Sequence, residues 1–128
     1  MAKKEYTYKG KTIEEMKRLS VQDVAQMLPA RQRRTLKRGF TEPQKILLKK
    51  IRAGKKNIET HCRDMLIIPE MVGMNLKIHK GTKDWVLVAI TEDMVGHYLG
   101  EFAQTRSKVS HSSPGIGATR SSAAISVR

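Results

Sequence analysis

Most of the positive charge of this chain is concentrated in one short segment, and this concentration limits what the segment can become in a folded protein. Between residues 29 and 56 the sequence holds eleven lysines or arginines and a single acid, Glu42, for a net charge of +10. Such side chains are almost never fully buried, so the segment must lie on the surface. Like charges at this density repel one another unless a polyanion neutralises them. The sequence therefore predicts a surface segment that contacts a polyanion.

The remaining charge divides the rest of the chain. Residues 106–128 carry four basic residues and no acid, whereas residues 57–105 carry four basic residues and seven acids. At 128 residues we expect one domain with three parts. These are an N-terminal arm with a basic helical extension (1–56), an α+β core (57–105) and a basic extended tail (106–128). Nucleic acid is the polyanion that this arrangement favours over an anionic membrane.

Short local signals predict four helices in the N-terminal half, after an extended arm over residues 1–11. Residues 12–15 and 20–23 have the spacing of capping boxes, which predicts helices near 13–18 and 21–28. A third helix is expected over 30–38, ended by Gly39. The fourth should run from a capping box at Thr41 to about Ala53. On this fourth helix we expect an inner face made of Ile46, Leu47 and Ile51 and an outer stripe made of Lys45, Lys49, Arg52 and Lys56.

Three apolar segments predict a small sheet in the core. Residues 65–68 are nearly all apolar, 74–79 alternate, and 85–90 are apolar on both faces, which favours a central or helix-covered strand. Residues 70–73 and 93–96 repeat the pattern acid-Met-Val-Gly, and each is expected to form one helical turn closed by glycine. The fold class is therefore α+β, with a three-stranded, mainly antiparallel sheet packed with helices. The tail is expected to be disordered alone or ordered by RNA.

The pattern of chemically active residues does not indicate an enzyme. His61, His79, His97 and His111 lack metal-ligand spacing, and the serines crowd into the tail. No phosphate-binding or nucleophile motif is present. We therefore expect no catalytic residues, no metal and no cofactor. A single cysteine, Cys62, and an apolar run no longer than 85–90 favour a cytoplasmic protein without a membrane span.

Low aromatic content indicates how nucleic acid would be contacted. Aromatic residues make up 5% of the chain, without an interleaved pair on one strand, so base stacking on the sheet is not expected. The composition favours phosphate and shape contacts with structured RNA or DNA. For His97, which lies between two glycines, two interpretations stay open: a core histidine and an RNA contact. A basic architectural DNA-binding protein remains the alternative function, although such a protein does not need a mildly acidic core.

Several short motifs occur in a fixed order between Arg63 and Arg106. They are IPEMVG at 68–73, IHKG at 78–81, ITEDMVGH at 90–97 and LGEFA at 99–103. Together they resemble the S19 family of small-subunit ribosomal proteins. The segments ARQRR at 30–34, LLKK at 47–50 and PGIGAT at 114–119 resemble its archaeal and eukaryotic branch, in which the eukaryotic members are called S15.

This resemblance implies an α+β ribosomal protein bound to ribosomal RNA in the head of the small subunit, in the cytoplasm. It also implies the head protein S13 as a neighbour, a tail near the A-site or P-site tRNA, and proximity to the large subunit. In the family, positions matching the basic helices, the His97 turn and Arg106 contact RNA. The candidate RNA-binding residues are Arg31, Arg33, Arg34, Lys37, Arg38, Lys45, Lys49, Lys50, Arg52, Lys55, Lys56, Arg63, Lys80, Lys83, His97, Arg106 and Lys108.

Overall fold

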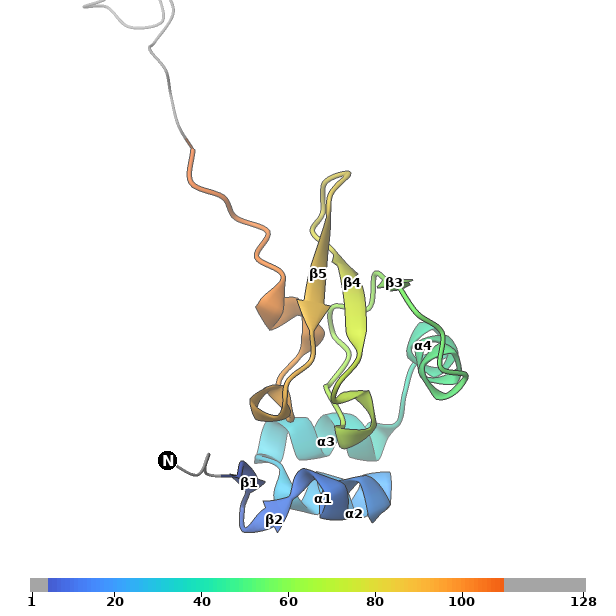
Figure 1. Ribbon diagram of the computed structural model, residues 1–128, viewed down its shortest axis with the longest axis vertical. Helices are drawn as coiled ribbons and strands as arrows, with labels where there is room; N and C mark the ends of the chain where they lie inside the picture. The colour runs from blue at the N-terminus through green and yellow to red at the C-terminus, as the bar shows by residue number, and fades with distance from the viewer. Residues whose placement is uncertain (1–4, 110–128) are drawn as a thin grey trace, which may run out of the picture.

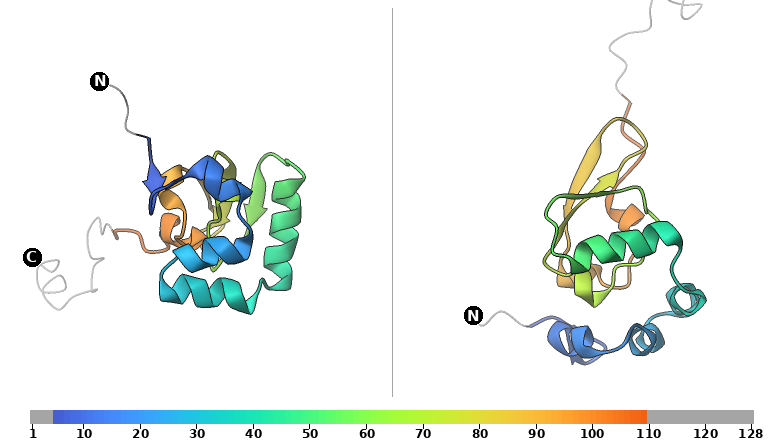
Figure 2. Two further views of the ribbon diagram at one scale, coloured as in Figure 1. Left: turned by 90° about the horizontal axis from the view of Figure 1, so that it is seen from below. Right: turned by 90° about the vertical axis from the view of Figure 1, so that its right-hand side faces the viewer.

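The computed structural model describes residues 5–109, so most of the tail and its 114–119 motif lie outside the described residues. Three helices form a layer at one end of a small sheet, and a fourth lies beside it (Figures 1 and 2). The helices are α1 (Ile13–Arg18), α2 (Val21–Met27), α3 (Ala30–Arg38) and α4 (Glu42–Arg52). All four confirm the sequence prediction within a residue or two.

Side-chain caps explain why these short helices begin where they do. At α1 the Glu15 carboxylate accepts the Thr12 N–H at 3.1 Å, and the Thr12 hydroxyl oxygen accepts the Glu15 N–H at 3.4 Å. At α4 the Thr41 N–H donates to Gln44 Oε1 at 3.1 Å. The other end of the Gln44 amide donates to Asp64 Oδ2 at 2.9 Å, so this cap also ties α4 to the core.

The inner face of α4 differs from the prediction at one position. Ile46 is 53% exposed, whereas Leu48 is buried with Leu47 and Ile51. The buried stripe also includes Gln44, which is 5% exposed. Positions 44, 47, 48 and 51 share one helical face, and position 46 lies on the opposite side. The prediction was wrong at Ile46 because it assigned this residue by its apolar character, although position 46 is out of phase with 44, 48 and 51 on the helix.

The central sheet contains β3 (Ile58–Thr60), β4 (Asn75–His79) and β5 (Trp85–Ala89) in the order β3-β4-β5. Strand β3 runs parallel to β4 over three residue pairs, and β4 runs antiparallel to β5 over five. This arrangement confirms a small, mainly antiparallel sheet in an α+β fold. The expectation that β5 is a central or helix-covered strand was wrong, because β5 lies at the edge of the sheet and its Leu87 is 61% exposed.

The prediction of a strand at residues 65–68 was also wrong. This segment is buried, and its backbone bonds go to residues 96–99 instead of the sheet: Ile67 N–H donates to the His97 carbonyl at 2.8 Å, and Leu99 N–H donates to the Met65 carbonyl at 2.9 Å. The third strand is β3, which alternates buried, exposed and buried residues. An apolar segment enclosed on all sides has no periodicity that distinguishes a strand from a buried connection.

The arm expected over residues 1–11 folds back on itself in its described part. Strands β1 (Thr7–Tyr8) and β2 (Lys11–Thr12) form a hairpin, with positive φ at Lys9 and Gly10 in the turn. Tyr8 packs against the core, and this burial raises the pKa of its phenol. Residues 5–12 are therefore part of the folded domain.

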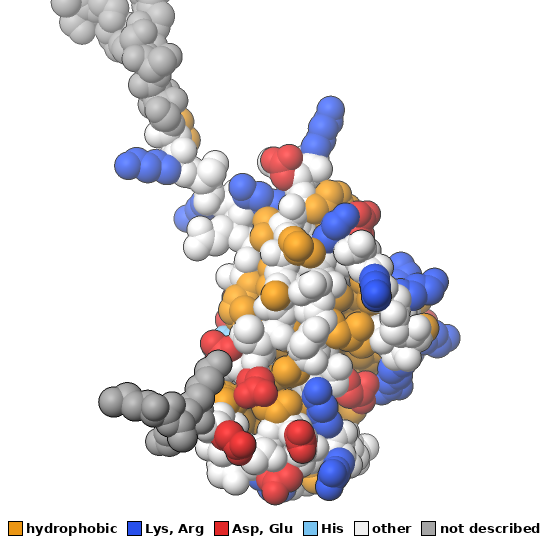
Figure 3. Space-filling view, in the orientation of Figure 1, with side chains coloured by type: hydrophobic (Ala, Val, Ile, Leu, Met, Phe, Trp, Pro, Cys, Tyr) orange, Lys and Arg blue, Asp and Glu red, His pale blue; other side chains and the backbone are white. Residues whose placement is uncertain are grey.

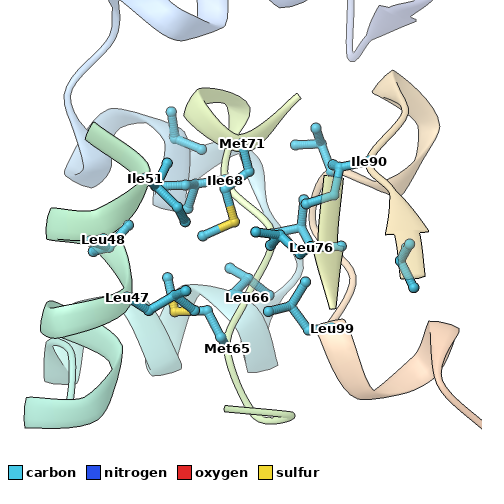
Figure 4. Close-up of a cluster of buried hydrophobic side chains, with 14 of the residues drawn as sticks. Leu47, Leu48, Ile51, Met65, Leu66, Ile68, Met71, Leu76, Ile90 and Leu99 are labelled. Atoms are coloured by element: carbon cyan, nitrogen blue, oxygen red, sulfur yellow. The ribbon is translucent and has the colours of Figure 1, made fainter. Parts of the chain in front are cut away.

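One hydrophobic core joins the helices to the sheet. Figure 4 shows α4 side chains facing the 65–71 segment, with sheet residues on its other side. Three short 3-10 turns complete the enclosure: η1 (Pro69–Met71), η2 (Glu92–Met94) and η3 (Leu99–Phe102). The first two confirm the predicted glycine-closed turns, with φ of 89° at both Gly73 and Gly96. Core residues labelled in Figure 4 are Leu47, Leu48, Ile51, Met65, Leu66, Ile68, Met71, Leu76, Ile90 and Leu99.

Candidate nucleic-acid interface

Helices α3 and α4, with the turn that follows α4, carry most of the exposed lysines and arginines among the described residues. Leu36 is the only buried residue of α3, so this helix contacts the core along one narrow line. Figure 3 shows lysine and arginine side chains crowded on the right, where Figure 1 places α4, while acidic side chains gather over the lower part near α1. The exposed basic residues of this region are Arg31, Arg34, Lys37, Arg38, Lys45, Lys49, Lys50, Arg52, Lys55 and Lys56. We call these ten residues the basic surface.

Two smaller basic sites lie away from these helices. The β4–β5 turn carries Lys80 and Lys83 around Gly81, at the end of the sheet far from α1–α3 (Figure 1). Lys83 is exposed, whereas Lys80 is half-buried. Arg106 and Lys108 are exposed in the extended segment after η3. The candidates that the sequence proposed therefore lie at three separate places on the surface.

Two arginines among the candidates use their guanidinium groups inside the fold. Arg63 Nη1 donates to the His79 carbonyl at 2.8 Å, and its Nη2 donates to the carbonyls of Gly100 and Ala103 at 2.9 and 2.6 Å. Arg33 Nη2 donates to the carbonyls of Gln26 and Leu28 at 3.3 and 3.1 Å, near the end of α2. Both side chains are only partly exposed. The structure therefore gives Arg63 and Arg33 a role in holding backbone segments together.

Two cations of the basic surface have acidic neighbours. Arg52 donates two hydrogen bonds to the Glu70 carboxylate, at 3.0 and 3.2 Å, which raise the pKa of the guanidinium above its ordinary value. Lys45 pairs with Glu42 at 2.6 Å. All four side chains are well exposed, so these pairs contribute little to stability and remain accessible to a competing phosphate.

His97 lies at the surface and not in the core. Its side chain is 54% exposed, and Nδ1 lies 2.7 Å from Glu101 Oε2. The ring also meets Phe102 edge to face, with centroids 6.0 Å apart. The core interpretation was therefore wrong, whereas the RNA contact stays a prediction.

Sequence reasoning missed one cluster of rings. His61, His79 and Trp85 come together at one end of the sheet, with ring centroids 4.3 to 5.0 Å apart. We call these three side chains the ring cluster. His61 is distant from the other two along the chain, whereas positions 79 and 85 are cross-strand partners on either side of one turn. Correct pairing of the two predicted strands would have joined two of the three rings.

Neither metal chemistry nor a membrane span is evident in the described part of the chain. Within residues 5–109, no group of three or more His, Cys, Asp and Glu side chains is arranged to hold a metal ion. The helices of this same part are too short or too polar to cross a bilayer. The features of the candidate interface in this part of the chain are its basic side chains and the ring cluster.

Comparison with known proteins identifies the relatives of this chain. The family model described as Ribosomal protein S19 matches residues 34–111. The chain is also similar to the Small ribosomal subunit protein uS19 of Methanocella arvoryzae, with 58% identity over 120 residues. That alignment covers 94% of this chain and 85% of the relative.

Proposed function

Because this chain belongs to the ribosomal protein S19 family, we propose that it is a structural constituent of the small ribosomal subunit that binds ribosomal RNA. The observation that carries this proposal is the basic surface on α3 and α4. Its charge is exposed, while the buried core is apolar and residues 57–105 carry four basic residues against seven acids. Such charge does not stabilise a folded domain, but it strengthens binding to RNA.

Contacts with RNA phosphates are the mode of binding that this surface supports. Arginine forks and lysine ammonium groups both suit phosphate oxygens, and each neutralised phosphate releases counterions. The proposed contacts are the basic surface together with Lys80, Lys83, His97, Arg106 and Lys108. Arg33 and Arg63 support this surface from within, because Nη2 of Arg33 and both Nη atoms of Arg63 donate to backbone carbonyls.

The family resemblance supports a finer placement in the ribosome. We place the protein in the head of the small subunit, beside the head protein S13 and near the large subunit. In Figure 1 the segment through Lys108 leads away from the folded body, which suits a tail directed toward the A-site or P-site tRNA. The ribosome in the cytoplasm is the expected location, and the role is one of binding without catalysis.

Charge reversal with a matched control tests the proposed function. The interface variant combines Lys49→Glu with Lys56→Glu, and the control combines Lys11→Glu with Lys17→Glu; all four lysines are exposed. Each variant is expressed with a tag, and its comigration with small subunits is followed through a high-salt gradient. The control should comigrate like the wild type, whereas the interface variant should be depleted from the subunit fraction. Equal retention of the two variants would contradict the proposed surface.

A further inference from the structure

The ring cluster is held in place by contacts on several sides. The His61 and His79 ring centroids lie 4.3 Å apart, and Trp85 meets both rings nearly edge-on, at 5.0 Å. The Gly81 N–H donates to His79 Nδ1 at 3.1 Å, and the His79 carbonyl accepts from Arg63. These contacts fix the orientation of His79. The His61 ring lies against His79 at an interplanar angle of 38°, so it loses little further freedom when a ligand binds.

The cluster lies on the face of the sheet that points away from the core. In the ladder between β4 and β5, His79 pairs with Trp85 and Lys77 pairs with Leu87. The buried residues Leu76 and Ile78 alternate with these positions and so point to the opposite face. His61 is exposed, and Leu87 is 61% exposed. Aromatic and apolar side chains are thus presented to solvent beside lysines.

His61 also borders an open hollow between α4 and β3. The hollow has a volume of about 220 Å³, and its lining includes Pro43, Ile46, Lys50 and His61. Ile46 is the α4 residue found exposed against expectation, and it supplies an apolar wall here. Glu59 also lines the hollow, but its carboxylate is paired with Lys77 at 3.1 Å. An aromatic ring, an apolar wall and a lysine therefore converge on one recess.

We propose that this hollow binds one unpaired nucleobase of RNA, stacked on the His61 ring, with Lys50 contacting the adjacent phosphate. The inference rests on the proposed function and adds a contact that reads a base to contacts that read phosphates. Unpaired bases stack on histidine and other aromatic side chains, and Lys50 belongs to the basic surface. This combination favours a nucleotide over an apolar protein segment, which would leave Lys50 without a partner. It differs from the sequence-based expectation, which spoke against base stacking on the sheet.

Two oligonucleotides of equal charge separate base contacts from phosphate contacts. One is a short single-stranded oligoadenylate, and the other is an abasic ribose-phosphate chain of the same length. Full-length protein is titrated with each at low salt, and affinity is measured by fluorescence anisotropy of the labelled oligonucleotide. Trp85 is the only tryptophan in the sequence, so its emission reports on the ring cluster during the same titration.

The variants are His61→Ala, His61→Phe and Lys50→Gln. His61→Ala should weaken oligoadenylate binding by about 5- to 150-fold, the range for loss of one stacked base, and leave abasic binding unchanged. His61→Phe should restore binding. Lys50→Gln should weaken binding of both chains to the same extent. Melting curves confirm folding, which removal of an exposed side chain is not expected to disturb.

Several results would overturn the inference. Equal affinity of wild type and His61→Ala for oligoadenylate excludes the stacked base. If His61→Ala loses affinity equally for oligoadenylate and for the abasic chain, His61 contacts phosphate or has a structural role. If His61→Ala binds both chains normally yet fails to enter small subunits, the ring cluster docks a protein. Failure of the wild type to bind oligoadenylate would also overturn the inference, whereas failure to bind its ribosomal RNA fragment would contradict the proposed RNA-binding function itself. Base-dependent loss with rescue by phenylalanine supports the inference.

Discussion

Replacing Arg63 should lower the free energy of unfolding of the domain without weakening RNA binding by the basic surface. Its guanidinium joins three backbone carbonyls from two distant segments, at 2.6 to 2.9 Å. A hydrogen bond to a charged group contributes about 1.5 to 3 kcal/mol, and carbonyls left without a donor add a desolvation cost. The site is only partly buried, so water replaces some of these bonds. We therefore expect Arg63→Ala to lower the free energy of unfolding by about 3 kcal/mol.

Urea unfolding followed by circular dichroism and Trp85 fluorescence measures this change. Arg34→Ala is the matched control, because Arg34 is an exposed arginine of α3, and its unfolding free energy should stay within about 0.5 kcal/mol of wild type. RNA affinity should show the reverse order, with a loss for Arg34→Ala and none for folded Arg63→Ala. The reasoning fails if Arg63→Ala is as stable as wild type and binds RNA more weakly than Arg34→Ala.

Two further predictions concern the neighbourhood of Arg63 and the tail. A Cβ at Gly100 would lie 2.9 Å from the Arg63 carbonyl oxygen, so Gly100→Ala should cost about 1 to 3 kcal/mol in an unfolding titration; unchanged stability would show that this contact relaxes freely. Deletion of residues 109–128 should leave the protein in small subunits but change A-site tRNA binding in a filter assay. Exclusion of the truncated, folded protein from subunits would make the tail an assembly anchor instead.

Local signals made the helices predictable, because capping residues precede α1, α2 and α4, and α3 lies between Pro29 and Gly39. The Thr12–Glu15 capping pair and the positive φ of Gly39, which is 87°, could both be predicted from residue types that are close together in the chain. The sheet was harder to predict, because its third strand is set by packing. Residues 65–68 are buried on all sides, whereas the short segment 58–60 pairs in parallel with β4. Tertiary contacts, which are absent from a local pattern, decided between them.

The candidate site shows the same limit. The distribution of charge along the chain located the basic surface, because lysine and arginine side chains are almost never fully buried. It did not distinguish Arg63 from Arg34, because only the folded backbone shows which guanidinium meets three carbonyls. The ring cluster was missed because His61 joins His79 and Trp85 only after β3 and β5 flank β4.

The salt dependence of RNA binding tests most directly whether the basic surface contacts phosphates. Affinity of the full-length protein for its ribosomal RNA fragment is measured over a range of salt concentrations, and log affinity is plotted against log salt. With about seven to nine phosphates neutralised at about 0.7 to 0.9 each, the slope should lie between about −5 and −8. A slope shallower than about −2 would contradict the account, because so few phosphates would leave most of the basic surface without a partner.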